Sequence, residues 1–182
     1  MEKTALVLID IQNDYFEGGA LPLENPIEAA TKAQQLLNEF RNAERPIIHI
    51  QHLAANPELG FMLPDTKGQE IHSSVAPKPQ ETVLTKHYPN SFWETDLENT
   101  LRKLGIEHVV IAGMMTHMCV STTTRAAMER GFQTTVIQDA CATKALELGG
   151  KTIPAYTVHE TALAELTLLA NIKPLAAFLS KA

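Results

Sequence analysis

Three side chains that are far apart in the sequence could together carry out nucleophilic catalysis: Asp10, Lys86 and Cys119. Each ends or follows an apolar run about as long as a buried strand. In an open α/β sheet the carboxyl ends of parallel strands lie at one edge, where ligands bind. A thiolate can attack a carbonyl carbon, a carboxylate can accept the thiol proton, and a cation favours the charged form of both. The sequence therefore predicts covalent chemistry at the sulfur, with Asp10 as the proton acceptor.

The segment 111–130, IAGMMTHMCVSTTTRAAMER, places Cys119 near the start of a predicted helix. An apolar run stops at a turn of small residues, helical spacing follows, and Gly131 ends it. With Thr116 as the N-cap, unpaired backbone amides and the helix dipole would surround the sulfur, which predicts a pKa below the ordinary value of about 8.5. A buried structural cysteine is the alternative interpretation of the same residue.

The elements that must position these side chains alternate between strand and helix patterns. This alternation predicts parallel strand pairing and right-handed crossovers. The predicted fold is therefore α/β, a three-layer α/β/α sandwich with a mostly parallel, Rossmann-like sheet. The tail after Pro174 is a further candidate for a short edge strand. Strand patterns cover 4–9, 47–52, 82–86, 108–112 and 132–138, and helix patterns cover 25–45, 95–104, 119–130 and 154–170.

The segment 53–80 follows neither pattern. It contains four prolines and is longer than an ordinary connection in a compact domain. Loops of this length are usually functional or disordered. We interpret it as a cover over the site, with Phe61, Met62 and Leu63 as its apolar contacts. A mobile surface loop that contacts nothing is the alternative.

Composition sets limits on the class of protein. With 182 residues and 45% apolar content, one domain over 1–182 is expected. The net charge of -6 and the lack of a Lys/Arg cluster argue against nucleic acid as a partner. No apolar run approaches the roughly 20 residues that span a bilayer, and no signal peptide is recognisable, so no membrane partner and a cytoplasmic location are expected. No glycine-rich phosphate-binding motif occurs, and no cofactor is predicted.

Three motifs carry a resemblance to the isochorismatase-like cysteine hydrolases, which include nicotinamidases, N-carbamoylsarcosine amidases and ureidoacrylate amidohydrolases. They are ALVLIDIQNDYF around Asp10, TKHYPNSFWETDL around Lys86 and GMMTHMCVSTTTRAAMERGF around Cys119. The resemblance implies that these three residues are a catalytic triad and that Cys119 forms a thioester-type intermediate. It also implies an oxyanion hole from the backbone amides of Met115 and Cys119, a non-proline cis peptide at Met114-Met115, and assembly as a dimer or tetramer.

Two departures from the family pattern narrow the expected reaction. Isochorismatases of this family typically carry glycine where Cys119 stands. Nicotinamidases bind a metal through an Asp-x-His segment after the second strand, where this sequence has His52-Leu53-Ala54. We therefore expect no metal, and hydrolysis of a C–N bond in a small amide, carbamoyl or ureido compound. Isochorismatase-type and nicotinamidase activities remain alternatives. The residues expected to bind the substrate are Gln12, Tyr15, His52, Trp93 and His117.

Two other classes of protein fit the same residues. One is a thiol enzyme in which a histidine, His87 or His117, is the base. The other is a non-catalytic α/β domain that binds a small molecule, with Cys119 inert or redox-sensing.

Overall fold

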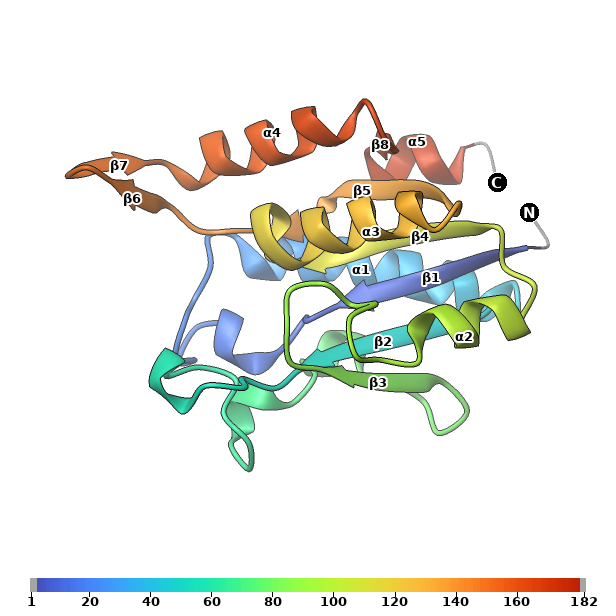
Figure 1. The fold of residues 1–182 in the computed structure, drawn as a ribbon, viewed down its shortest axis with the longest axis horizontal. Coiled ribbons are helices and arrows are strands. Elements are labelled where there is room, and N and C mark those ends of the chain that lie inside the picture. The colour runs from blue at the N-terminus through green and yellow to red at the C-terminus, as the bar shows by residue number, and fades with distance from the viewer. Residues whose placement is uncertain (1–2, 181–182) are drawn as a thin grey trace.

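The computed structural model describes residues 3–180 and contains a six-stranded parallel sheet (Figure 1). The strand order is β3-β2-β1-β4-β5-β8. Parallel strands that are buried on both faces have nearly continuous apolar sequences, and this explains the apolar runs found in the sequence. The strands are β1 (Thr4–Ile9), β2 (Ile47–His52), β3 (Thr82–Lys86), β4 (His108–Met114), β5 (Gln133–Ala142) and β8 (Asn171–Lys173).

Helices cover both faces of the sheet and create two apolar cores. In β1, Leu6 and Leu8 pack in the core that contains α1 and α5, whereas Ala5, Val7 and Ile9 pack in the core of α2, α3 and α4. The alternation follows from the two-residue period of a strand. The predicted three-layer α/β/α sandwich is confirmed. The helices are α1 (Pro26–Asn42), α2 (Leu97–Lys103), α3 (Ser121–Glu129), α4 (Ala155–Leu166) and α5 (Leu175–Leu179).

The order of the strands reverses beside β1. The chain runs outward from β1 through β2 to β3, then returns to β4 on the other side of β1 and continues to β5 and β8. Ligands of open α/β sheets bind beyond the carboxyl ends of the strands at such a reversal. The residues that follow β1 and β4 therefore occupy the favoured position for a site.

The structure corrects the prediction for the C-terminal tail. The edge strand is β8, before Pro174, and the residues after this proline form the helix α5. Leu175 and Phe178 are buried, and the Phe178 ring lies 6.5 Å from that of Phe40 in α1. A short helix buries both side chains in one core, which an edge strand would not.

A two-stranded antiparallel hairpin of β6 (Leu146–Leu148) and β7 (Lys151–Ile153) projects from the domain between β5 and α4 (Figure 1). Its sequence pattern is too short to have been predicted as strands. Between residues 3 and 180, no helix combines the length and the apolar character needed to cross a membrane. The cytoplasmic location and the homo-oligomeric assembly stay predictions.

Candidate active site

The ammonium group of Lys86, at the end of β3, brings the three predicted residues together. Its Nζ lies 2.7 Å from Asp10 Oδ2 and 3.2 Å from Cys119 Sγ. It also lies 2.9 Å from His52 Nδ1 and 3.1 Å from the carbonyl oxygen of Tyr88. Asp10, Lys86 and Cys119 are exposed by only 0%, 1% and 5%. One buried cation thus holds the carboxylate and the sulfur in a single cluster.

Asp10 directly follows β1 and turns the chain out of the sheet. Its backbone is left-handed, with φ 51°, a conformation that aspartate tolerates better than most residues. Its Oδ1 is buried and has no hydrogen-bond partner among the described residues. Buried polar atoms are nearly always paired, so an unpaired acceptor beside a thiol is a candidate proton acceptor.

Gly113 lets β4 approach β1 closely at Ile9, the residue that precedes Asp10. A Cβ at Gly113 would lie 2.0 Å from the carbonyl oxygen of Ile9, and the glycine has φ +142°. Only glycine fits both the contact and the conformation. The close approach sets the distance between the residue after β1 and the turn after β4.

The turn that carries Cys119 begins at a non-proline cis peptide, Met114-Met115, as the resemblance implied. A single π-helical turn follows over Thr116–Val120, and α3 then continues in α-helical geometry. The carbonyl of Met115 accepts from the amides of Met118 and Val120, at 3.1 and 3.2 Å. Short π-helical turns are frequent at functional sites.

The predicted capping role of Thr116 is wrong. Thr116 is the first residue of the π-helical turn, and Met115 occupies the N-cap position without a side-chain cap. The Thr116 hydroxyl instead pairs with His159 Nδ1 of α4, at 2.9 Å. The Thr116 side chain thus joins the π-helical turn to the neighbouring helix α4 instead of capping the turn.

The predicted low pKa of Cys119 is also wrong. Burial raises the pKa of this thiol to about 12, the negative charge of Asp10 raises it further, and Lys86 opposes both without overcoming them. Burial alone would lower the pKa of Lys86, but Asp10 and Cys119 outweigh it and raise that pKa above its usual value. The resting site therefore holds a protonated thiol beside a charged ammonium.

His52, the last residue of β2, is a neutral acceptor in this cluster. Burial first and the nearby Lys86 second lower its pKa to about 4. Ligand atoms of Asp10, His52 and Cys119 lie within 4.8 Å of one another, a donor set that could suit a metal ion. The Lys86 ammonium lies within 3.2 Å of all three residues, so a positive charge is already present among these donor atoms.

Gln12 and Tyr15, two more residues expected to bind the substrate, are both buried in the loop that follows Asp10. The Gln12 amide accepts from the backbone N–H of His52 and donates to the carbonyls of His52 and Gln69. With these bonds it braces the backbone. Burial raises the pKa of Tyr15 well above its usual value, and the charges of Cys119 and Asp10 add to this. Tyr15 is therefore a neutral phenol.

Trp93 and His117, the other two residues expected to bind the substrate, are not among the contacts of the Lys86 ammonium. Trp93 is 55% exposed. His117 Nδ1 pairs with the hydroxyl of Thr143 at 2.6 Å, and its side chain lines a cavity of about 440 Å³ between the β6–β7 hairpin and α4. The carbonyl of Tyr88 is a contact that sequence reasoning missed, because backbone groups leave no residue-type signal.

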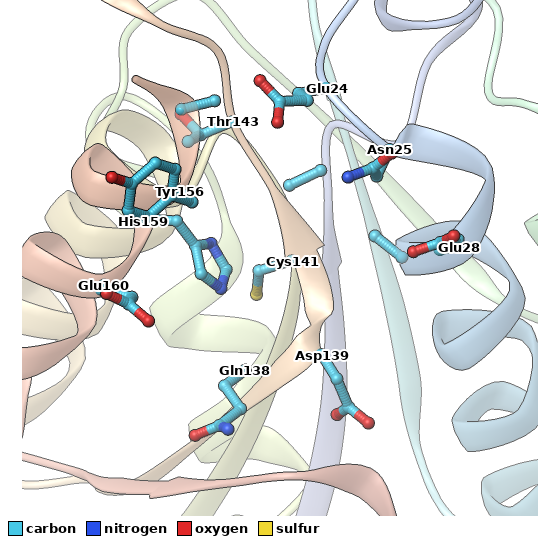
Figure 2. A pocket seen from close by; sticks show the side chains of 13 residues that line it. Glu24, Asn25, Glu28, Gln138, Asp139, Cys141, Thr143, Tyr156, His159 and Glu160 are labelled. Atoms are coloured by element: carbon cyan, nitrogen blue, oxygen red, sulfur yellow. The ribbon is translucent and has the colours of Figure 1, made fainter. Parts of the chain in front are cut away.

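A second cavity, of about 280 Å³, lies between α1, β5 and α4 (Figure 2). The Cys141 sulfur and the His159 ring point into it, with carboxylates on both walls. Cys141 Sγ donates to the carbonyl of Ile137 at 3.4 Å. None of Asp10, Lys86 and Cys119 lines this cavity, so it is separate from the triad.

Comparisons with known proteins cover nearly the whole chain. Residues 4–170 match the model of the Isochorismatase domain. The chain is 46% identical over 177 residues to the isochorismatase family protein YddQ of Bacillus subtilis, covering 97% of this chain and 98% of that protein. A crystal structure from Oleispira antarctica, described as an isochorismatase hydrolase, has a TM-score of 0.94 at 41% identity and covers 98% of this chain and 97% of that one.

A relative with a named reaction is the maleamate amidohydrolase of Pseudomonas putida. It is 30% identical over 152 residues, which covers 75% of this chain and 71% of that protein. Matches to the family model, to relatives and to a solved structure thus agree over most of the chain. The chain belongs to the isochorismatase-like hydrolase family.

Proposed function

We propose that this hydrolase cleaves a C–N bond of a small amide, carbamoyl or ureido compound through a covalent intermediate on Cys119. The observation that carries the proposal is the contact of one ammonium group with both a carboxylate and a thiol, at 2.7 and 3.2 Å. The relative named maleamate amidohydrolase supports a C–N bond as the target. Turnover requires no metal in this proposal, because Lys86 supplies the positive charge.

The first half of the proposed reaction is acyl transfer. Asp10 takes the proton of the Cys119 thiol as the sulfur attacks the carbonyl carbon and the carbonyl electron pair moves onto oxygen. The backbone amides of Met115 and Cys119 donate to that oxyanion. When the tetrahedral intermediate collapses, the C–N bond breaks and Asp10 returns the proton to the leaving nitrogen. A thioester on Cys119 and a free amine or ammonia result.

The second half returns the enzyme to its starting state. Asp10 accepts a proton from a water molecule, whose oxygen attacks the thioester carbon, and the C–S bond breaks as the acid forms. The proton then returns to the sulfur. Lys86 stays charged throughout, since its pKa is raised, and it stabilises the carboxylate and the sulfur whenever either is anionic.

A screen of small amides and ureides for ammonia release tests the proposal. Wild-type protein and Cys119→Ala are assayed side by side, with Cys141→Ala as the matched control for loss of a buried thiol. We expect a compound that the wild type and Cys141→Ala hydrolyse and Cys119→Ala does not. Mass spectrometry of acid-quenched enzyme should show an acyl adduct on Cys119. Equal turnover by Cys119→Ala would contradict the covalent mechanism.

A nicotinamidase-type reaction that requires a bound metal is the main alternative within the family, because Asp10, His52 and Cys119 are a possible donor set. Prolonged treatment with a chelator separates the two. We expect unchanged kcat and KM after the metal is removed, since the Lys86 ammonium already contacts all three residues. A loss of turnover that added Zn²⁺ restores would replace the metal-free mechanism.

The two other predicted classes are less compatible with the geometry. As bases, His87 and His117 are less well placed than Asp10. Their hydrogen bonds among the described residues lead to the Leu53 carbonyl and the Thr143 hydroxyl, whereas Asp10 shares the Lys86 ammonium with Cys119. Redox sensing favours an accessible thiolate, whereas Cys119 is buried with a raised pKa. A rate that falls below pH 6.5 and disappears with either histidine would favour a histidine base instead.

A further inference from the structure

A second buried carboxylate, Asp14, lies four residues after Asp10 and takes no part in the proposed reaction. It belongs to a short 3-10 turn and is 7% exposed. Its Oδ1 accepts from the backbone amide of Ala20 at 2.9 Å, and its Oδ2 accepts a short hydrogen bond from the amide of Met62. Unlike Asp10, both of its oxygens have backbone partners.

Gly68 closes the space around the same carboxylate. A Cβ at Gly68 would lie 2.1 Å from Asp14 Oδ1, a distance that real Cβ atoms essentially never show. No positive φ restricts this position, so the effect of a side chain here would be to displace the Asp14 carboxylate. Asp14 therefore contacts three places in the chain, at 20, 62 and 68. The last two belong to the segment 53–80.

This segment is attached to Lys86 and to two residues of the loop that follows Asp10, Gln12 and Tyr15. The amide of Leu53 donates to the carbonyl of Lys86 at 2.9 Å, and the carbonyl of Gln69 accepts from the Gln12 side chain at 2.7 Å. Met62 is completely buried. The Phe61 ring lies 6.4 Å from that of Tyr15, the residue influenced by the charges of Cys119 and Asp10.

The triad is at most 5% exposed, so a substrate needs some part of the surrounding chain to move. The segment 53–80 has no helix or strand longer than a 3-10 turn and is joined to the N-terminal loop by a single β-bridge, between Ile71 and Gln12. Its residues 62 and 69 bond to the side chains of Asp14 and Gln12. Segments with few internal hydrogen bonds open at lower free energy than sheets and helices. The Asp14 side chain accepts a hydrogen bond from the Met62 amide and lies against Gly68, so it is placed to control this opening.

We propose that Asp14 is a positioning residue that holds residues 60–68 closed over Cys119 and thereby controls access to the sulfur. The expected effect of Asp14 on KM and kcat rests on the proposed function, but its control of access to Cys119 does not. The carboxylate acts through the cover segment and does not touch the substrate.

The test measures alkylation of the two cysteines by iodoacetamide at fixed pH, read for each residue by mass spectrometry. In Asp14→Asn one acceptor oxygen is replaced by a donor, and a hydrogen bond to a charged group is lost. We expect Cys119 to react about tenfold faster or more, because bonds of this kind contribute that much to an opening equilibrium. Cys141 should keep its wild-type rate, since it is bonded to Ile137 and lies in a separate cavity.

Two further variants separate access from charge and from general destabilisation. Gly68→Ala displaces the carboxylate without changing any charge, and it should also speed alkylation of Cys119 selectively. Asp139→Asn is the matched control, because Asp139 likewise accepts a backbone amide, that of Leu175, at 2.7 Å but lies away from the cover. It should leave the Cys119 rate unchanged.

Each result bears on the proposal. Equal acceleration of both cysteines would mean global loosening and would overturn the gating role, as would an unchanged Cys119 rate in Asp14→Asn and Gly68→Ala. With a substrate in hand, both variants should raise KM more than they lower kcat. If no substrate is ever hydrolysed but Cys119 alone is exposed, the gate stands and the hydrolase proposal falls.

Discussion

The two cysteines of this chain form a natural comparison. Both are buried, at 5% and 6% exposure, and burial raises the pKa of both thiols to about 12. Cys119 lies in the turn that follows β4, and Cys141 lies near the end of the neighbouring strand β5, in register with Gly113. Cys119, however, has the Lys86 ammonium at 3.2 Å, whereas Cys141 Sγ donates to the Ile137 carbonyl. Burial is common to both thiols, so the contact with the Lys86 ammonium is what distinguishes Cys119 from Cys141.

Removal of each sulfur should separate the two thiols most strongly. Cys119→Ala should lower kcat by about 10⁴-fold or more, as loss of a nucleophile does in other covalent hydrolases. Thermal unfolding should still be cooperative, because alanine leaves only a small cavity. Steady-state kinetics and calorimetry on the same preparation check this. Residual activity within a factor of about ten of wild type would break the comparison.

Asp10→Asn should sharpen the comparison, because it affects turnover and thiol acidity in opposite directions. Without a proton acceptor, kcat should fall by about 10²- to 10⁴-fold. The thiol pKa of Cys119 should nevertheless decrease, since the negative charge that raises it is lost and Lys86 remains. Alkylation of Cys119 at neutral pH should therefore be faster in this inactive variant, and that of Cys141 unchanged. Slower alkylation of Cys119 would contradict the assigned electrostatics.

The pH dependence of the wild type follows from the raised pKa values. Because the thiolate is the reactive form, alkylation of both cysteines should keep increasing above pH 9 and approach a plateau only near pH 12. Each folded pKa lies above that of the unfolded chain, about 8.5. The associated stability is therefore complete below about pH 8.5 and is lost as the pH rises toward 12. Chemical denaturation between pH 7 and 11 measures this; constant stability would contradict it.

The sequence was sufficient to predict that Asp10, Lys86 and Cys119 lie close together, as they do in the structure. Asp10 and Lys86 follow or end strands in a βαβ pattern, and the rules of parallel sheets bring such positions to one edge. The turn after β4 was predictable only in outline. The π-helical geometry that puts Thr116 inside the turn, facing His159, depends on packing against α4 and has no residue-type signal.

The direction of the pKa shift of Cys119 was predicted wrongly for a related reason. The prediction considered the helix terminus and Lys86, which are local or motif-encoded. Burial of the sulfur depends on chain segments far apart in sequence, and the proximity of Asp10 adds a negative charge. Tertiary desolvation outweighed the local effects. The same limit applies to His117, whose hydrogen bond to Thr143 spans 26 residues.

The smallest effect is expected for Cys141→Ser, and it tests whether the second thiol is only structural. A hydroxyl can donate to the Ile137 carbonyl as the thiol does, so folding should be retained with a stability loss of about 1 kcal/mol, the ordinary size for a single substitution. kcat and KM should match the wild type, since Cys141 lies in a cavity that the triad does not line. Part of the alkaline loss of stability should disappear, because one of the two raised thiol pKa values has been removed. If turnover fell severalfold while the fold stayed intact, Cys141 would have to influence the nucleophile turn, most directly through His159 and Thr116, and the contrast between the two thiols would no longer hold.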